Sequence, residues 1–167
     1  RINFQIRWIV GPLEDSESNP LKDSEGNPLA KEIEPIDLAL DAQENLYVLD
    51  NANQLILQFD EGGRLLGVFA EGLKNPTNLT VENGFFYVLE ADDKEVLKFD
   101  IQTRTQETIS LKIDPEKKIE LSGLVVDEVG NLYVGDKRIL GKEAEEDRFL
   151  YKFNPAGELI GVITEFP

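Results

Sequence analysis

Acidic side chains recur at fixed places along the chain, and carboxylates are the groups here best suited to acid–base or cation-binding chemistry. One set follows a short apolar segment that contains a Tyr-Val pair: Asp50, Glu90 and Asp136. A second set follows another apolar segment: Asp60, Asp100 and Asn154. A residue that returns in every copy of a repeat usually serves the repeat. We therefore predict that both sets accept backbone N–H bonds in turns rather than form a catalytic cluster.

Composition narrows the chemistry further. The chain has no His and no Cys. These 167 residues therefore cannot by themselves form a Ser-His-Asp triad, a Cys-His pair or a zinc-thiolate site. A net charge of −16 without any basic cluster excludes nucleic acid as a partner. A basic protein surface or a divalent cation fits better, and acidity alone also maintains solubility. No apolar run approaches the ~20 residues of a membrane span, so no membrane insertion is expected in this segment.

The acids are positioned by a pattern that occurs three times between residues 35 and 167. Each copy has four short apolar segments separated by turn residues such as Gly62-Gly63 and Asn83-Gly84. The Tyr-Val pairs lie 40 and then 46 residues apart, at Tyr47, Tyr87 and Tyr133. A repeat of this length made of four strands is typical of a β-propeller blade. The predicted fold is all-β, with three four-stranded antiparallel blades.

The repeat divides the chain into four parts. Residues 35–74 form blade 1, residues 75–120 blade 2 and residues 121–167 blade 3. Residues 1–34 are expected to hold an orphan outer strand of a preceding blade, over 4–11, and a long acidic loop. All belong to one propeller domain, which we expect to be incomplete because natural rings have about four to eight blades. Two routes to ring closure remain open: a fragment that lacks further blades, or association of two copies into a six-bladed ring.

The pattern from Pro35 to Asp60, P-x-D-L-A-L-D…N-L-Y-V-L-D…Q-L-I-L-Q-F-D, resembles the NHL-type repeat. It is also similar to the gluconolactonase/strictosidine synthase-like group of six-bladed propellers. The NHL resemblance implies a binding platform in an extracytoplasmic location, either secreted, periplasmic or in the cell envelope. The second resemblance implies a metal-dependent hydrolase or lactonase with calcium in its central channel. Whether the chain is an enzyme stays open at this point.

The second resemblance also implies where calcium would bind. Its ligand position falls on Asp37 in blade 1, Asn78 in blade 2 and Gly123 in blade 3. Asp37 and Asn78 offer oxygen atoms that suit a hard cation, whereas Gly123 offers no side chain. The alternative is that both residues cap a turn after proline by bonding local backbone. Calcium is the only cofactor that the sequence implies.

The longest connections are predicted to share one face, over residues 11–34, 113–121 and 137–147. Function on repeat scaffolds concentrates on elaborated loops, so this long-loop face is the predicted partner-binding surface. Its candidate contact residues are Glu14, Asp15, Glu17, Asp23, Glu25, Lys137, Arg138, Lys142, Glu143, Glu145, Glu146 and Asp147. The alternative is that these loops are tolerated surface insertions.

Three functions follow from these observations. The first is a non-enzymatic binding platform that contacts protein or glycan partners through the long-loop face. The second is part of a calcium-dependent, gluconolactonase-like hydrolase. The third is an architectural module within a large assembly, where the acidic surface packs against basic neighbours.

Overall fold

The computed structural model describes residues 14, 19–22, 25–29, 33–116, 119–136 and 150–163. Within these ranges the chain is built from strands and turns, without a helix. The described residues therefore hold no helix of the length and apolarity that crossing a membrane requires. The predicted orphan strand over 4–11 and the loop over 137–147 lie outside the described residues.

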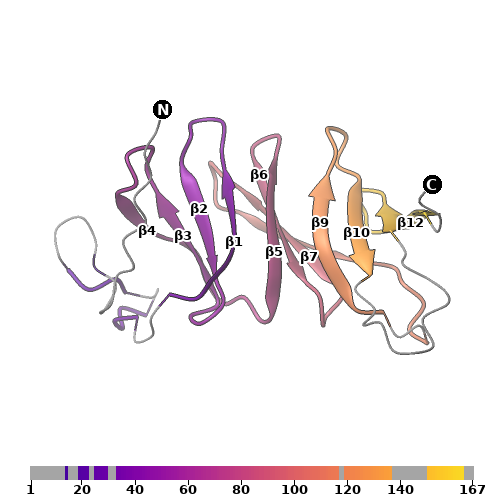
Figure 1. Ribbon diagram of the computed structural model, residues 1–167, viewed down its shortest axis with the longest axis horizontal. Helices are drawn as coiled ribbons and strands as arrows, with labels where there is room; N and C mark the ends of the chain where they lie inside the picture. The colour runs from indigo at the N-terminus through magenta and orange to yellow at the C-terminus, as the bar shows by residue number, and fades with distance from the viewer. Residues whose placement is uncertain are drawn as a thin grey trace, which may run out of the picture. The chain divides into compact units, whose positions relative to one another are not determined.

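Twelve strands form three four-stranded antiparallel sheets, and the strands of each sheet pair in chain order (Figure 1). Blade 1 contains β1 (Pro35–Leu40), β2 (Leu46–Asp50), β3 (Leu55–Phe59) and β4 (Leu65–Ala70). Blade 2 contains β5 (Pro76–Glu82), β6 (Phe85–Glu90), β7 (Glu95–Asp100) and β8 (Gln106–Ser110). Blade 3 contains β9 (Leu121–Val126), β10 (Leu132–Asp136), β11 (Leu150–Phe153) and β12 (Leu159–Ile163). This confirms the predicted all-β fold of three blades, a partial β-propeller.

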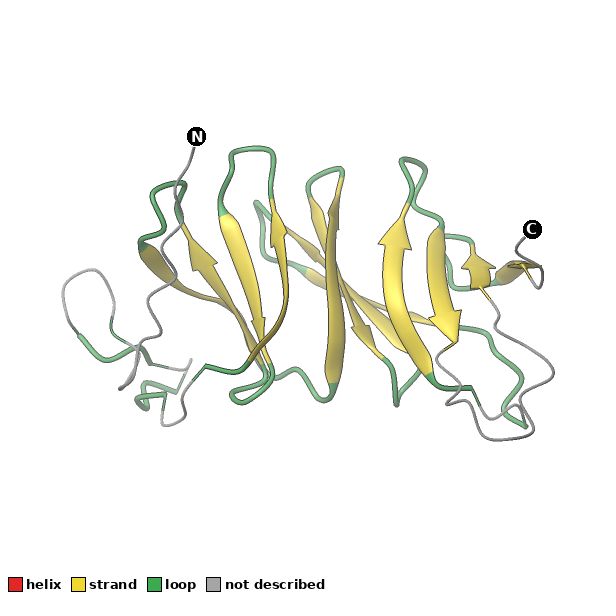
Figure 2. Cartoon of the chain, viewed as in Figure 1, coloured by secondary structure: helices red, strands yellow, loops and turns green. Residues whose placement is uncertain are grey.

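The chain, whose strands and loops Figure 2 distinguishes by colour, divides by its internal contacts into two compact units. The first, Arg1–Lys74, holds blade 1, and the second, Asn75–Pro167, holds blades 2 and 3. In the second unit the two blades share one apolar core, in which residues of β6, β7 and β8 pack with residues of β9, β10 and β11. Buried Leu89, Val96 and Ile109 belong to blade 2, and buried Leu124 and Tyr151 belong to blade 3. Blade 2 is thus stabilised by the blade that follows it.

The core of the first unit includes part of the acidic loop. Leu21 is 7% exposed and packs in a cluster with Val48 and Leu57 of blade 1, and Leu29 lies against the same cluster. The Leu29 N–H donates to the Leu21 carbonyl at 2.8 Å, and Lys22 pairs with Pro28 in an antiparallel bridge. The two Asn-Pro-Leu triplets of the sequence are therefore the two arms of a small hairpin. Each arm contributes one leucine to the face of blade 1.

Asp50 and Asp136 of the recurring acids bond backbone N–H groups, as predicted. Asp50 is fully buried, and its Oδ1 accepts hydrogen bonds from the N–H groups of Glu34 (2.9 Å) and Ala52 (3.0 Å). Asp136 occupies the same place in blade 3 and accepts from the Glu120 N–H at 3.2 Å. These carboxylates satisfy backbone donors at the strand ends, which gives them a structural role.

Candidate functional site

Each blade carries a tyrosine in its second strand, and in blade 1 this tyrosine is locked by a carboxylate. Asp41 opens the turn between β1 and β2, where its Oδ1 accepts from the N–H groups of Gln43 and Asn45, both at 2.9 Å. Its Oδ2 accepts from the Asn45 amide (2.8 Å) and the Tyr47 hydroxyl (3.0 Å). The Gln58 amide donates to the same hydroxyl at 2.9 Å. Both hydrogen-bonding roles of the Tyr47 hydroxyl are filled inside blade 1.

Blade 3 repeats the arrangement. Asp127 Oδ1 accepts from the N–H groups of Val129 (3.2 Å) and Asn131 (2.8 Å). Its Oδ2 accepts from the Asn131 amide (2.8 Å) and the Tyr133 hydroxyl (3.2 Å). Lys152, which pairs with Tyr133 across the sheet, places its ammonium 4.9 Å from the centre of the tyrosine ring. The pattern Asp-x-x-x-Asn-x-Tyr is thus a structural unit of these two blades.

Blade 2 departs from this pattern. Two residues, Asn83 and Gly84, connect β5 to β6, where five connect the corresponding strands of the other blades. Glu82 and Phe85 flank this turn in the places of the aspartate and the asparagine. Among the described residues the Tyr87 hydroxyl has no hydrogen-bond partner, although Tyr87 is only 5% exposed. Blade 2 therefore keeps the tyrosine but lacks the groups that bind its hydroxyl.

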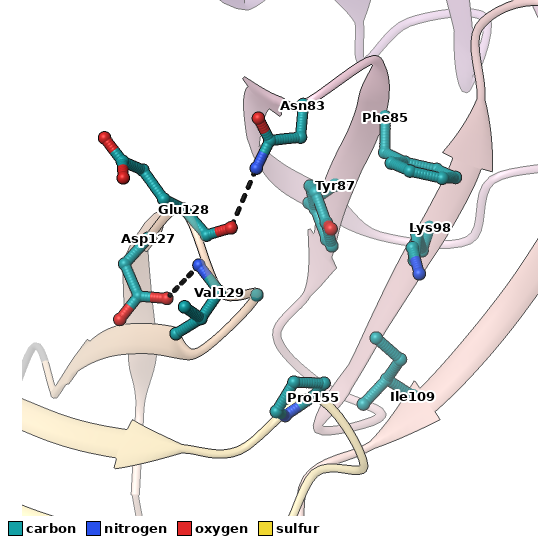
Figure 3. Close-up of a pocket in the computed structure, with 10 residues that line it drawn as sticks. Asn83, Phe85, Tyr87, Lys98, Ile109, Asp127, Glu128, Val129 and Pro155 are labelled. Carbon is teal, nitrogen blue, oxygen red and sulfur yellow. Dashed lines mark hydrogen bonds between the residues drawn. The ribbon is translucent and has the colours of Figure 1, made fainter.

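The shortened turn leaves a cleft of about 190 Å³ inside the second unit (Figure 3). It lies between the β5–β6 turn of blade 2 and the β9–β10 and β11–β12 turns of blade 3. Its lining residues are Asn83, Phe85, Tyr87, Lys98, Ile109, Asp127, Glu128, Val129, Gly130 and Pro155. The Asn83 side-chain amide donates to the Glu128 carbonyl at 2.8 Å and so links the two blades at the rim. The result is a cleft with largely apolar walls and a single tyrosine hydroxyl without a protein partner.

The electrostatics of the cleft are set by one cation among several acids. Lys98 lies 4.5 Å from the centre of the Phe85 ring and 3.5 Å from the Glu107 carboxylate. Burial raises the pKa of Tyr87, and the charges of Glu82 and Glu107 raise it further. The phenol is therefore protonated across the physiological range and can donate a hydrogen bond.

The turn aspartates of the other blades are held ionised. Burial opposes ionisation of Asp41, but the hydrogen bonds from Asn45, Gln43 and Tyr47 outweigh it and lower the pKa of this carboxyl. For Asp127 the hydrogen bond from the Asn131 side chain is the largest cause of a lowered pKa. Ionised and fully engaged carboxylates of this kind serve the fold.

The residues predicted as calcium ligands each bond backbone. Asp37 in the first unit accepts from the Leu38 N–H at 2.9 Å, and Asn78 in the second unit accepts from the Gly123 N–H at 2.8 Å through its Oδ1. Calcium binding at Asp37 and Asn78 stays a prediction. The structure also brings together Glu90, Asp93 and Glu95, whose carboxylate oxygens lie within 4.8 Å of one another. The sequence did not predict this acidic group.

The predicted partner-binding residues are described only in part. Glu14 and Glu25 are exposed. The rest of the set lies outside the described residues: Asp15, Glu17, Asp23, Lys137, Arg138, Lys142, Glu143, Glu145, Glu146 and Asp147. Their role in binding stays a prediction.

Because the Tyr47 and Tyr87 hydroxyls differ in their hydrogen bonds, their removal should affect the free energy of unfolding differently. Tyr47→Phe is expected to lower the free energy of unfolding by about 1–2 kcal/mol, because it removes a hydroxyl bonded to both Asp41 and Gln58. Tyr87→Phe is expected to change it by less than about 0.5 kcal/mol, because its hydroxyl bonds no protein group. Urea unfolding followed by circular dichroism measures both. An equal loss of unfolding free energy in the two variants would mean that the Tyr87 hydroxyl, like that of Tyr47, is hydrogen-bonded to protein groups.

Comparison with known proteins identifies the fold. No protein-family profile and no curated protein matches the sequence. A protein of unknown function from Bacteroides caccae matches with a TM-score of 0.58 at 14% identity, over 77% of this chain and 48% of that one. Hydrazine synthase from Kuenenia stuttgartiensis matches with a TM-score of 0.58 at 16% identity, over 84% and 39%. A chain of the nidogen/laminin complex matches with a TM-score of 0.56 at 18% identity, over 81% and 48%.

At these identities the likeness concerns the fold alone. The neighbours include propeller-like proteins, which agrees with the three blades described above. The chain spans less than half the length of each of these three structures.

Proposed function

We propose that the chain is a non-enzymatic recognition module of the β-propeller type that contacts a protein or glycan partner. The observation that carries the proposal is the cleft of the second unit, where no group of the described residues bonds the hydroxyl of the largely buried Tyr87. No buried side-chain nitrogen or oxygen of the described residues lacks a partner, so the Tyr87 hydroxyl is open to solvent although the residue as a whole is largely buried. The hydroxyl opens onto the cleft, so its partner is water or a bound ligand.

Two further considerations support recognition. The NHL-type resemblance implies a binding platform, and an extracytoplasmic setting with it. The fold neighbour from the nidogen/laminin complex belongs to an assembly of two proteins. The long-loop face predicted from the sequence remains part of the proposal as a second contact surface.

Binding of the labelled chain to peptide and glycan arrays tests the proposal. Val129 is 73% exposed at the cleft, so Val129→Asp should leave folding intact and place a charge against an apolar ligand. Leu66→Asp is the matched control, because Leu66 is 49% exposed on blade 1 and does not line the cleft. We expect Val129→Asp to weaken the strongest array contacts about tenfold, a loss of ~1.4 kcal/mol, and Leu66→Asp to preserve them. No retained peptide or glycan, or equal binding by both variants, would contradict the proposal.

A further inference from the structure

We infer that the cleft of the second unit binds a peptide segment, which inserts one ring-sized apolar side chain and offers an uncharged carbonyl to the Tyr87 hydroxyl. The inference rests on the proposed function and names the ligand of the same site. It follows from the hydrogen-bonding groups of the cleft, its charges and its size.

The hydrogen-bonding groups point to a ligand with few polar atoms. Both oxygens of Asp127 are engaged by donors of blade 3, and the Asn83 amide nitrogen donates to the Glu128 carbonyl. The Tyr87 hydroxyl has no hydrogen-bond partner within the part of the chain that the structure describes, and Figure 3 shows it between Asn83 and Lys98. A sugar presents many hydroxyls that would each need a partner. A single peptide carbonyl matches a single hydroxyl donor, which favours a peptide over a glycan.

The charges disfavour an anionic ligand. The ammonium of Lys98 is paired with the Glu107 carboxylate at 3.5 Å. The charges of Glu82 and Glu107 already raise the pKa of Tyr87, and Asp127 and Glu128 add two further acids at the lining. A ligand carboxylate or phosphate would be repelled by these acids and by the net charge of −16 on the chain. An uncharged acceptor can bind the Tyr87 hydroxyl without adding a negative charge beside these acids.

The size and walls of the cleft point to one apolar side chain. Phe85, Ile109, Val129 and Pro155 supply the apolar part of the lining. The volume of about 190 Å³ slightly exceeds the ~150 Å³ of an engineered cavity that binds benzene. A phenyl-sized group therefore fits, with its adjoining backbone carbonyl near the Tyr87 hydroxyl.

The test is a titration followed by amide chemical shifts of the ¹⁵N-labelled chain. The probes are N-acetyl-L-phenylalanine amide and N-acetyl-L-phenylalanine, which differ at one end by a charge. We expect the neutral amide to shift the backbone signals of Asn83, Gly84 and Gly130, with a Kd on the order of 1 mM. Tyr87→Phe should weaken binding about tenfold, and the control Tyr133→Phe, whose hydroxyl is bonded to Asp127, should bind as the wild type does.

The inference is overturned if the charged probe binds as tightly as the amide, or if Tyr87→Phe binds the amide as the wild type does. Methyl β-glucoside separates this failure from failure of the proposed function. Shifts of the same three signals by the glucoside or the charged probe, without shifts by the amide, would leave a recognition site with a different ligand. No shift with any of the probes would overturn both the inference and the cleft as a recognition site.

Discussion

Replacing Gly157 by alanine is expected to destabilise the chain by about 3–5 kcal/mol, because the new methyl group would enter space filled by backbone. Gly157 lies in the β11–β12 turn with φ of +79°, where an L-residue is strained. A Cβ there would collide with the Ser110 carbonyl oxygen and come within 3.2 Å of Ile109 Cγ2. The Gly157 carbonyl also accepts from the Lys112 N–H at 2.8 Å, so this turn joins blade 3 to blade 2.

Gly63→Ala is the matched control. Gly63 occupies the corresponding turn of blade 1, with φ of +78° and the same N–H bond back to the first residue of the turn. A Cβ at Gly63 would meet no atom within 4 Å. We expect a loss of about 1 kcal/mol, the cost of the left-handed backbone alone. Urea unfolding of the two variants measures the difference, and equal losses would show that blades 2 and 3 do not approach each other closely at Gly157.

Asp41→Ala is expected to cost about 2–4 kcal/mol, because the carboxylate is 8% exposed and accepts four hydrogen bonds. Its loss would leave the Gln43 and Asn45 N–H groups and the Tyr47 hydroxyl without their acceptor. Asp41→Asn is the control for size. It keeps one acceptor oxygen but loses the charge, and a smaller loss of stability is expected.

The same carboxyl gives a dependence on pH. The folded-state pKa of Asp41 is lowered, so the folded protein holds this proton less tightly than the unfolded chain. The stability that ionised Asp41 contributes is therefore fully present above about pH 5 and is lost as the pH falls through about 4 and below. The difference in unfolding free energy between the wild type and Asp41→Asn should shrink over that range. A difference that stays constant from neutral pH to pH 3 would mean that the Asp41 charge is not engaged in the folded state.

The repeat in the sequence predicted most of the fold, because strand alternation and turn residues are local signals. The pattern Q-L-I-L-Q-F-D that ends at Asp60 contains β3, Leu55–Phe59. The sequence did not predict the packing of Leu21 and Leu29 on blade 1. That contact depends on a hairpin without regular strands, and such pairing has no periodic pattern to reveal it.

The cleft could not be predicted from the repeat itself. Because Tyr47, Tyr87 and Tyr133 share a position in the repeat, the sequence favours the same packing role for all three. The tyrosine does pack in the core of the second unit, and it also lines the cleft. The sequence feature that distinguishes blade 2 lies beside Tyr87. Glu82 and Phe85 occupy the positions that hold aspartate and asparagine in blades 1 and 3. An exception to a repeat is informative about function because the rest of the repeat shows what the fold requires.

The central claim is that the cleft beside Tyr87 is a binding site for a neutral peptide group. The most direct measurement is a crystal structure of the chain soaked with N-acetyl-L-phenylalanine amide. We expect the phenyl ring to lie between Phe85, Ile109 and Pro155, with a ligand carbonyl oxygen within about 3.2 Å of the Tyr87 hydroxyl. A cleft that holds only water at saturating ligand, or a ligand bound at another place on the chain, would contradict the claim.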